Sequence, residues 1–580
     1  MSGAMSSASY VPERLDHLGI VAAVCREIGL AEWLDAQDEH THERVSVGTA
    51  TVAMILNGLG FSNRRLYLVP QFFATKPVER LLGTGISAED LSDDCLGRAL
   101  DWLYAHDPTT LFAGIALQAR QRFGIAARQV HVDTTSFSVS GIYAPEKPEK
   151  SEERVPEPAA EPAAGDLDAH VVAITYGYSR DRRADLKQWM LALATTREGD
   201  VPLFLRPLDG NTSDQVSLLA AVEALADQLR SADTAAAPVA AGSQEPRLFV
   251  ADGGLYSEAA MGRLNAAEIA WVSRVPATLN AARTALERRD DTAWQTSADA
   301  QTQWWSQELA FPQGRERWVV VRTHSGERQA RATLERQAST AQDEWRKRLW
   351  HLSNRPFACE ADARAALAQE TKTLPAWLHV HPPQVRIEPR YAGRGRPRPG
   401  AVPASQEIFI TTTCQVDEQE LTRAVERAAS FIIATNVLDG AQLADEDLIA
   451  IYKDQHSVER GFAFLKDPLF LASSVFLKKP ERIMALSLVM VLCLLVYRLA
   501  EHRLREQLAA THQTIPNQVK KPTNRPTMRW VFQCFEGIEL LHIQQGPAPP
   551  TSLILRLTPL HQQILALLGP TYEQFYESSN

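Results

Sequence analysis

The sequence predicts an α/β fold with an all-helical N-terminal domain and a helical C-terminal region. Apolar residues recur at helical spacing through residues ~10–125, as in LGIVAAVCREIGLAEWL. From Gln129 onward, short segments rich in β-branched residues alternate with apolar-periodic helices, a pattern typical of a sheet covered by helices. A segment of mixed character, 280–428, separates the early strands from a later strand at 431–436.

The α/β region begins with the strand QVHVDTTSFSV, in which β-branched residues alternate with polar ones, Asp133 among them. We expect further strands at 170–178 (HVVAITYGY) and 189–196 (WMLALATT). The next elements expected are the helix VSLLAAVEALADQLR, the strand RLFVADGG, a helix near 256–266 and a strand at 269–276. After the strand FIIATN, helices are expected to dominate.

At about 150 residues per domain, a chain of 580 residues suggests three or four structural units. We place the boundaries at 1–125 (helical N-terminal domain), 126–279 (first part of the α/β domain), 280–428 (insertion), 429–510 (second part of the α/β domain) and 511–580 (C-terminal region).

The composition excludes several classes of protein. With 45% apolar and 22% charged residues, the chain is neither wholly disordered nor collagen-like. Its 60 basic and 70 acidic residues give a net charge of −10, which does not by itself indicate a nucleic-acid binder. The Pro- and Glu-rich stretch 144–168, which we expect to be a disordered loop, carries eight acids and three bases. It therefore accounts for half of the net negative charge.

Six scattered cysteines without a C-x-x-C pair argue against a zinc ribbon or a disulfide framework, and favour reduced thiols in a cytosol. No signal peptide is evident at the N-terminus. The apolar run Ile483–Tyr497 has fifteen residues, whereas about 20 are needed to span a bilayer. We expect a buried core helix there; a membrane-associated helix is the alternative.

Two acidic residues stand at the ends of predicted strands, Asp133 and Asp252. The carboxyl ends of strands are where ligand sites form in open α/β sheets. Taken alone, such an Asp is more often a turn former or a helix cap, and Gly253 and Gly254 suit a turn after Asp252.

A third carboxylate lies in IYKDQHSVERGFAFLKDP, which we expect to form one helix. At about 100° per residue, four polar residues share one narrow face: Tyr452, Gln455, Glu459 and Lys466. An apolar stripe beside them would anchor the helix to a core: Val458, Phe462 and Leu465. A solvated face with a coincidental spacing is the alternative.

Together, Asp133, Asp252 and Glu459 would make an all-oxygen site of the kind that Mg²⁺ prefers. Two such ions about 4 Å apart can stabilise both the attacking and the leaving oxygen of a phosphoryl displacement. The predicted chemistry is therefore metal-dependent phosphoryl transfer.

Six motifs occur in a fixed order: HVDTTSFSVSG, ITYGYSRD, DGNTSD, FVADGGLYS, FIIATN and Y-x2-Q-x3-E-x6-K. In this wording and order the chain resembles bacterial insertion-sequence transposases of the DDE class, in the group with the Y-x2-R-x3-E-x6-K signature. The resemblance implies a ribonuclease-H-like mixed sheet interrupted by a β-containing insertion. It also implies that Asp133, Asp252 and Glu459 bind two Mg²⁺ or Mn²⁺ ions.

In the same resemblance, Tyr452 and Lys466 become contacts to the DNA backbone. The position of the family's Arg is occupied by Gln455, so a guanidinium that binds phosphate is replaced by a neutral amide. Asp214, in the DGNTSD motif, is explained adequately by helix capping, and we assign it no catalytic role.

The resemblance further implies strand cleavage at the ends of a DNA element and transfer of the freed 3′-OH to target DNA. The expected partners are terminal inverted repeats, recognised by the N-terminal domain, target DNA and a second copy of the chain in a synaptic complex. A bacterial cytoplasmic, nucleoid-associated location without a membrane is implied as well. The alternatives are a metal-dependent nuclease without joining activity and a catalytically degenerate DNA-binding repressor.

Positive charge is local. Residues 385–398 hold five Arg and one Glu. Within them, Arg394-Gly395-Arg396-Pro397 resembles an AT-hook, which would bind a narrow minor groove of DNA. The alternative is a basic loop that contacts phosphates. Residues 478–530 hold ten bases and three acids, as expected of a phosphate-binding stripe. For Trp304 and Trp305 we favour core packing over base stacking.

Overall fold

The computed structural model describes residues 9–38, 44–61, 66–141, 143, 171–178, 183–235, 247–287, 294–393, 397–467, 477–544 and 551–579. The chain divides into two compact units. The first unit combines Met1–Ser273 with Ala450–Asn580, and the second is Arg274–Ile449, which contains the predicted insertion. The predicted acidic loop, 144–168, lies outside the described residues.

The N-terminal part of the first unit is largely helical, as predicted. Its helices are α1 (Leu18–Ile28), α2 (Leu30–Asp35), α3 (Val47–Leu59), α4 (Val69–Phe73), α5 (Val78–Leu82), α6 (Asp93–Ala105) and α7 (Pro108–Phe123), with short 3-10 turns at Leu66–Leu68 and Ala88–Asp90. Local sequence sets several of these ends. Ser46 and Ser92 cap α3 and α6 through their side chains, and Gly29 ends α1 in the left-handed conformation at φ 73°.

The prediction of an all-helical N-terminal region is wrong at its start. Ser9–Arg14 forms a strand, β1, that pairs antiparallel with β17 (Glu539–Gln544), which in turn pairs with β18 (Thr551–Leu555). The C-terminal region is accordingly not purely helical. Its other elements are short strands β15 (Ile515–Pro516) and β16 (Pro522–Thr523), helices α17 (Met528–Cys534), α18 (Pro559–Leu568) and α19 (Pro570–Glu573), and a 3-10 turn at Gln574–Tyr576.

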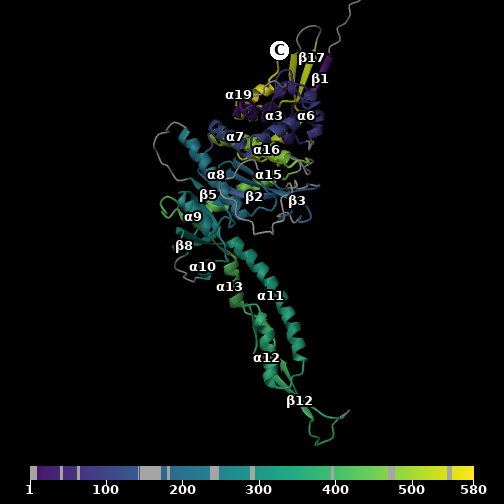
Figure 1. Cartoon of the computed structure of the whole chain (residues 1–580), viewed down its shortest axis with the longest axis vertical. Coiled ribbons are helices and arrows are strands. Elements are labelled where there is room, and N and C mark those ends of the chain that lie inside the picture. The colour runs from purple at the N-terminus through teal and green to yellow at the C-terminus, as the bar shows by residue number, and fades with distance from the viewer. Residues whose placement is uncertain are drawn as a thin grey trace, which may run out of the picture. The chain divides into compact units, whose positions relative to one another are not determined.

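The long helix α16 (Pro480–Ala510) forms the centre of the first unit (Figure 1) and packs against α1, α3, α6 and α7. By length and composition it is the one helix in the described ranges that could cross a membrane. Within this fold, however, 94% of its most apolar 18-residue window is buried. This burial agrees with the prediction of a core helix over Ile483–Tyr497.

The sheet of the first unit has the strand order β4-β3-β2-β5-β6. The strands are β2 (Gln129–Val139), β3 (Lys187–Thr196), β4 (Pro202–Leu208), β5 (Leu248–Ala251) and β6 (Ala270–Val275). β2, β3 and β4 pair antiparallel, whereas β2, β5 and β6 pair parallel, so the sheet is mixed. Helices α8 (Asp214–Ala235) and α15 (His456–Leu465) both pack against β2 and β3, and α9 (Glu258–Ala266) joins β5 to β6.

The predicted strand at 170–178 is wrong: its described part makes only an isolated bridge, between Thr175 and Gln188. The backbone there is held against the turn after β4, because Nε2 of Gln188 donates hydrogen bonds to the carbonyl groups of Tyr178 and Gly210 at 3.2 and 2.7 Å. A Cβ on Gly177 would lie 2.0 Å from the carbonyl oxygen of Gly210. This close backbone approach replaces regular strand pairing.

The second unit has its own strand order, β14-β9-β8-β7, beside which long helices extend to a hairpin (Figure 1). Its elements are α10 (Asn280–Glu287), β7 (Gln295–Thr296), β8 (Thr302–Phe311), β9 (Gly314–Thr323), α11 (His324–Ser353), α12 (Glu360–Glu370), a 3-10 turn (Thr371–Thr373), β10 (Leu378–Val380), β11 (Gln384–Arg390), β12 (Ser405–Thr411), β13 (Cys414–Val416), α13 (Glu418–Ala428) and β14 (Ser430–Thr435). Trp304 and Trp305 on β8 are buried, in agreement with core packing.

Candidate catalytic site

The parallel pairing of β2 with β5 places two of the predicted site residues on neighbouring segments of the chain. The register aligns Val132 with Ala251, so the next residues along these neighbouring strands are Asp133 and Asp252. Paired residues of adjacent parallel strands project to the same side of a sheet. The prediction that both residues stand at strand ends is correct for Asp252, which follows β5, but wrong for Asp133, which is the fifth of the eleven residues of β2.

Asp133 lies at a buried position, with 7% of its surface exposed. Its Oδ1 accepts a hydrogen bond of 2.7 Å from the backbone N–H of Thr134. Because side chains alternate along a strand, Thr134 points to the opposite face, where its Oγ1 donates a 2.7 Å hydrogen bond to Oδ1 of Asp214 at the start of α8.

Asp252 is held in the turn that follows β5. Its Oδ1 accepts a 2.8 Å hydrogen bond from the N–H of Gly254, and its carbonyl group accepts one of 2.7 Å from Oγ of Ser273. A Cβ on Gly254 would lie 2.9 Å from Oδ1 of Asp252 and 3.5 Å from Cβ of Asp214. Asp214 therefore lies close to the turn that carries Asp252. Helix capping, the role expected of Asp214 from the sequence, does not predict this proximity, although Asp214 belongs to the DGNTSD motif.

The segment expected to be one helix is broken. Helix α14 (Asp445–Lys453) ends before Asp454, and α15 starts at His456. The N–H groups of Gln455 and Ser457 bond three residues back rather than four, and Asp454 accepts a 2.6 Å hydrogen bond from Arg197 of the β3–β4 turn.

The single helical face predicted for the four polar residues is consequently wrong. Tyr452 lies on α14, Gln455 directly precedes α15, Glu459 is in its first turn and Lys466 follows its end. The predicted apolar stripe, in contrast, is confirmed: Val458, Phe462 and Leu465 are all buried.

Helix α15 covers the face of β2 on which Asp133 lies. Nζ of Lys466 is 5.7 Å from the ring centroid of Phe137, and Phe137, four residues along β2 from Asp133, projects to the same side. The helix that carries Glu459 is thus packed across the strand that carries Asp133.

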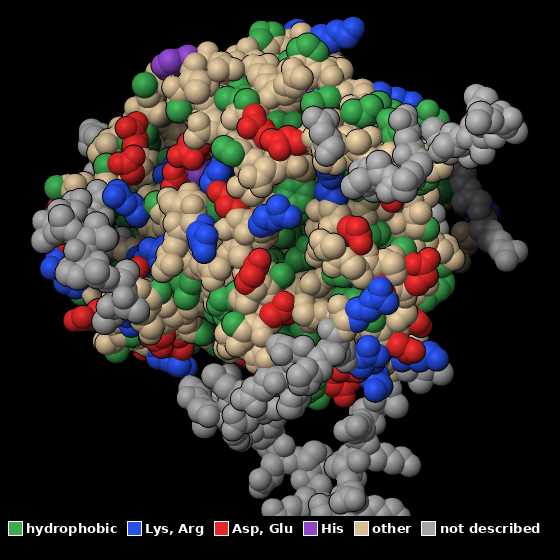
Figure 2. Space-filling model, turned by 90° about the horizontal axis from the view of Figure 1, so that it is seen from above, with side chains coloured by type: hydrophobic (Ala, Val, Ile, Leu, Met, Phe, Trp, Pro, Cys, Tyr) green, Lys and Arg blue, Asp and Glu red, His purple; other side chains and the backbone are tan. Residues whose placement is uncertain are grey.

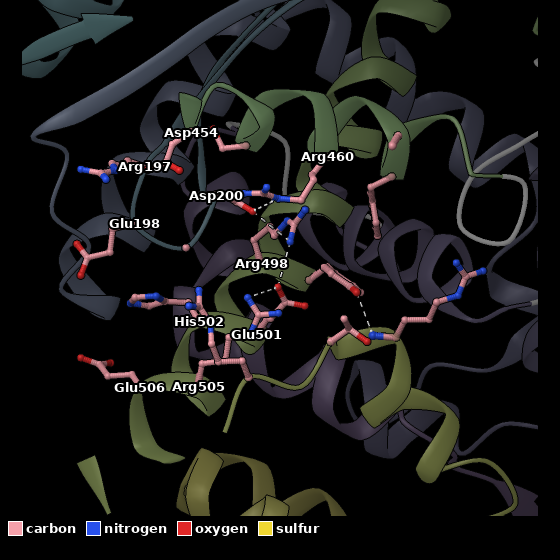
Figure 3. Close-up of a pocket in the computed structure, with 18 of the residues that line it drawn as sticks. Arg197, Glu198, Asp200, Asp454, Arg460, Arg498, Glu501, His502, Arg505 and Glu506 are labelled. Carbon is pink, nitrogen blue, oxygen red and sulfur yellow. Dashed lines mark hydrogen bonds and ion pairs between the residues drawn. The ribbon is translucent and has the colours of Figure 1, made fainter. Parts of the chain in front are cut away.

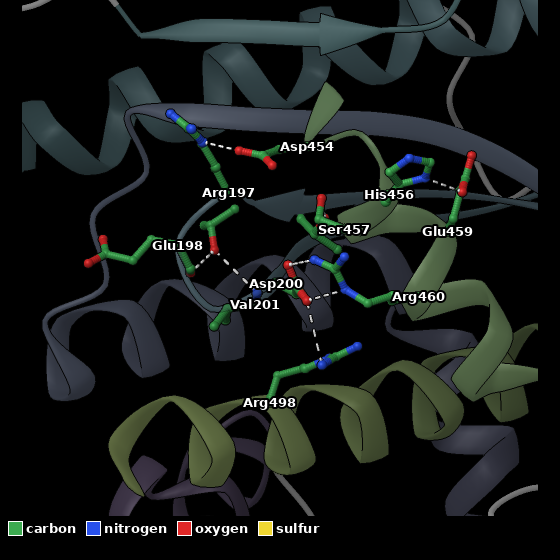
Figure 4. A network of polar contacts seen from close by, with 12 residues as sticks. Arg197, Glu198, Asp200, Val201, Asp454, His456, Ser457, Glu459, Arg460 and Arg498 are labelled. Carbon is green, nitrogen blue, oxygen red and sulfur yellow. Dashed lines mark hydrogen bonds and ion pairs between the residues drawn. The ribbon is translucent and has the colours of Figure 1, made fainter. Parts of the chain in front are cut away.

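The carboxylate of Glu459 does not join the two aspartates in this conformation. Its side chain is 61% exposed, and Oε2 lies 2.8 Å from Nδ1 of His456 (Figure 4). In the part of the chain that the structure describes, no group of three or more His, Cys, Asp or Glu side chains is placed to hold a metal ion. The predicted DNA contacts Arg394 and Arg396 lie outside the described residues.

The residue after Glu459 belongs to a network that sequence reasoning missed. Arg460 donates two hydrogen bonds, of 2.9 and 2.8 Å, to the carboxylate of Asp200 in the β3–β4 turn (Figure 4). These hydrogen bonds raise the pKa of Arg460. Arg498 of α16 lies 3.5 Å from the same carboxylate. Asp200 is 260 positions from Arg460 and still farther from Arg498 in the sequence. A local sequence pattern could not have predicted this cluster.

The sequence matches models of known protein families. A family model described as "Transposase DDE domain" matches residues 160–496, more than half of the chain. The chain belongs to the DDE transposase family. The match contains Asp252 and Glu459, and Asp133 precedes it. A second model, "Domain of unknown function (DUF4277)", matches residues 11–117, which include most of the N-terminal helices.

This member of the DDE transposase family was also compared with curated proteins and with solved structures. No curated protein matches the chain. Among solved structures, it is similar to one described as "Cryo-EM structure of piggyBac transposase synaptic complex with hairpin DNA", with 9% sequence identity and a TM-score of 0.34 over 91% of this chain and 82% of that chain.

Proposed function

We propose that this protein is a DNA transposase that hydrolyses a strand at each end of its element and transfers the freed 3′-OH into target DNA. Family membership supports the transposase activity. The observation that carries the proposal is the register of β2 and β5, in which Asp133 and Asp252 directly follow the paired residues Val132 and Ala251. We also propose that the sheet order β4-β3-β2-β5-β6 is that of a ribonuclease-H-like domain.

The donor set fits divalent cations, which DDE transposases use. Asp133 and Asp252 would supply carboxylate oxygens, and one or two carboxylates with waters are typical for Mg²⁺. Glu459 would join them once its exposed side chain turns away from His456. Two Mg²⁺ or Mn²⁺ ions bound there would activate the attacking oxygen and stabilise the departing 3′-oxygen.

The chain itself positions these groups. Hydrogen bonds from Thr134 to Asp214 and from Ser273 to the Asp252 carbonyl group hold the middle of β2 and the turn after β5. Buried Val458 and Phe462 hold α15 against β2 and β3. Groups that are already held in the reactive geometry lower the activation barrier of phosphoryl transfer.

The remaining roles follow the family resemblance. Tyr452 and Lys466 would contact the DNA backbone, Gln455 would contribute a neutral hydrogen bond, and Arg394 and Arg396 would bind the minor groove. The N-terminal helices would recognise terminal inverted repeats, and two copies of the chain would assemble on paired ends. We place this reaction in the cytoplasm of a bacterium, at the nucleoid.

A second candidate is a DNA-binding protein that has lost cleavage. Two observations favour it: Gln455 replaces a guanidinium, and Glu459 is bonded to His456 instead of facing the aspartates. A nuclease that cuts without joining is a third candidate with the same site.

Cleavage and joining assays on element-end oligonucleotides separate the three candidates. The transposase should cut with Mg²⁺ or Mn²⁺ and should join pre-cleaved ends to a plasmid. Cutting without joined product would identify a nuclease, and metal-independent binding without cutting would identify a repressor. Asp227→Asn is the matched control for loss of a carboxylate, because this side chain is 76% exposed on α8.

A further inference from the structure

Basic and acidic side chains are interspersed over the described residues of the face drawn in Figure 2. A cavity of about 950 Å³ lies between the β3–β4 turn, α15, α16 and the segment 524–529 (Figure 3). Its charges are balanced, because six arginines and six carboxylates line it. Neither feature would attract DNA through an excess of positive charge, so smaller groups of cations decide where phosphates can bind.

Half of the ten basic residues in 478–530 form ion pairs with carboxylates of the first unit. These five are Arg482, Arg498, Arg503, Arg505 and Arg529. Arg525 is exposed and lines the balanced cavity. Lys478 and Lys479 precede α16, a helix of 31 residues that is about 45 Å long. Lys520 and Lys521 come after its end and form a separate pair of cations.

Lys520 and Lys521 lie in the tip of a two-stranded hairpin. Its strands β15 and β16 pair antiparallel, Ile515 with Thr523 and Pro516 with Pro522. The chain contains no Asp or Glu from residue 507 to residue 535. Both lysines are exposed, and neither makes an ion pair with another described residue. The five residues of the tip, 517–521, therefore carry a net charge of +2.

The base of the hairpin is anchored to the first unit. Ile515 is buried, with 2% of its surface exposed. Nε1 of Trp530, in α17, donates a 2.8 Å hydrogen bond to the carbonyl group of Pro516. After β16, the N–H of Arg525 donates a 3.1 Å hydrogen bond to Oγ1 of Thr523. These contacts hold the base, so that substitutions in the tip can remove charge without releasing the hairpin.

Asn517 orders the backbone of the tip. Its Oδ1 accepts hydrogen bonds from the N–H groups of Val519 and Lys521, at 3.0 and 2.9 Å. Its N–H donates to the carbonyl group of Lys521, and its carbonyl group accepts from the N–H of Lys520, both at 2.8 Å. Gln518, Val519 and both lysines are exposed, Val519 to 70%. The tip thus presents an amide, an apolar group and two cations on an ordered backbone.

Lys520 has a strained backbone conformation. Its φ is 59°, in the left-handed region. A residue with a Cβ is less stable there than glycine is. Strained residues are found preferentially at sites that bind ligands. A cation thus occupies the position of the tip at which glycine would stabilise the turn.

We propose that this hairpin inserts its tip into the major groove of duplex DNA, with Lys520 and Lys521 bound to backbone phosphates. The proposal rests on the transposase function and assigns a DNA contact to it. A two-stranded β-ribbon fits the major groove, which is about 12 Å wide. Glutamine side chains bind base edges in this groove, so Gln518 would reach the bases while the two ammonium groups replace counterions on the phosphates.

The first test removes both charges of the tip, in Lys520→Gln/Lys521→Gln. The matched control, Arg122→Gln/Lys372→Gln, removes two exposed charges outside the hairpin. Circular dichroism and the melting temperature check that both full-length variants are folded. Fluorescence anisotropy measures binding of a labelled oligonucleotide of mixed sequence, duplex or single-stranded, at several salt concentrations. The hairpin variant should bind the duplex about tenfold more weakly and its salt slope should fall by about 2, whereas the control should stay within about twofold of wild type.

The second test separates the charge of Lys520 from its conformation. Lys520→Gly removes the cation and relieves the strain, so the melting temperature should equal or exceed that of wild type while duplex binding weakens about threefold. Lys520→Arg keeps the charge and should bind the duplex like wild type. Binding at the wild-type level in Lys520→Gly would overturn the proposal.

Two other results would also overturn the proposal. Equal losses in the hairpin variant and the control would show that net charge alone decides binding, and a loss confined to single strands would exclude the groove. If duplex binding depends on the hairpin but wild type cuts no strand with Mg²⁺ or Mn²⁺, the hairpin contact stands and the transposase function fails. If wild type cuts and joins strands while the hairpin variant binds the duplex equally well, the function stands and the hairpin contact fails.

Discussion

Oγ1 of Thr134 donates a 2.7 Å hydrogen bond to Oδ1 of Asp214, and so ties the strand that carries Asp133 to the first turn of α8. The same Asp214 lies beside the turn after Asp252. One carboxylate is therefore hydrogen-bonded to the residue after Asp133 and lies close to the turn after Asp252.

Thr134→Val removes this donor while keeping the branched shape of the side chain. A hydrogen bond to a charged group contributes about 1.5–3 kcal/mol, so we expect strand cleavage to slow about tenfold or more, with oligonucleotide binding unchanged. Single-turnover cleavage assays measure the first quantity and anisotropy the second. Thr422→Val, at an exposed site on α13, is the control. Cleavage at the wild-type rate in Thr134→Val would remove Asp214 from the positioning of the site.

Gly177→Ala should destabilise the first unit, because its Cβ would lie 2.0 Å from the carbonyl oxygen of Gly210. Overpacking of this kind costs about 1–3 kcal/mol. Chemical denaturation of the full chain measures the loss. Gly393→Ala is matched, since a Cβ there meets nothing within 4 Å. Equal midpoints for the two variants would show that the segment around Gly177 is not pressed against the turn.

His17 makes stability depend on pH. It is buried, its Nε2 lies 2.8 Å from the carbonyl oxygen of Leu59, and desolvation lowers its pKa from 6.5 to about 4. As the pH falls, His17 therefore takes up a proton in the unfolded chain at a higher pH than in the folded chain. The contribution of this histidine to stability is consequently present above pH 6.5 and is lost as the pH falls toward 4.

The expected loss from His17 is on the order of 3 kcal/mol over that interval. Urea unfolding at a series of pH values measures it, and His17→Asn should make the profile between pH 6.5 and 4 less steep, leaving the loss due to His131, whose pKa burial also lowers to about 4. A profile as steep in the variant as in wild type would show that His17 titrates normally.

Asp200 and Asp185 both bind arginine, but in different surroundings. The side chain of Asp200 is 10% exposed, whereas that of Asp185 is 63% exposed beside Arg183. Asp200→Asn leaves the buried guanidinium group of Arg498 with Glu501 as its remaining acidic partner, and should cost up to about 3 kcal/mol of unfolding free energy. Asp185→Asn should cost less than about 1 kcal/mol. Thermal or urea unfolding compares them, and equal effects would contradict the buried network.

The parts of the fold that were predictable are those with local causes. The β-branched strand around Asp133 and the short strand before Asp252 carry their pattern within a few residues. The helix expected through Asp454 is broken where Arg197, 257 positions away, binds that residue. The strand Ser9–Arg14 likewise exists because its partner comes from the opposite end of the chain.

Around the predicted site, too, only part of the arrangement has local causes. The register of β2 and β5 sets Asp133, within β2, and Asp252, after β5, one position beyond the paired Val132 and Ala251. The orientation of Glu459 depends on its own rotamer and on His456, and neither pattern nor motif specifies a rotamer. Arg460 and Asp200 meet only because α15 packs beside the β3–β4 turn.

Binding of Mn²⁺, followed by electron paramagnetic resonance, tests most directly whether Asp133 and Asp252 hold metal together. We predict that Asp133→Asn and Asp252→Asn each weaken binding at least about tenfold, that the double variant is little worse than either single one, and that Asp227→Asn binds like wild type. Wild-type affinity in either single variant, or losses that add as for two independent sites, would contradict the account.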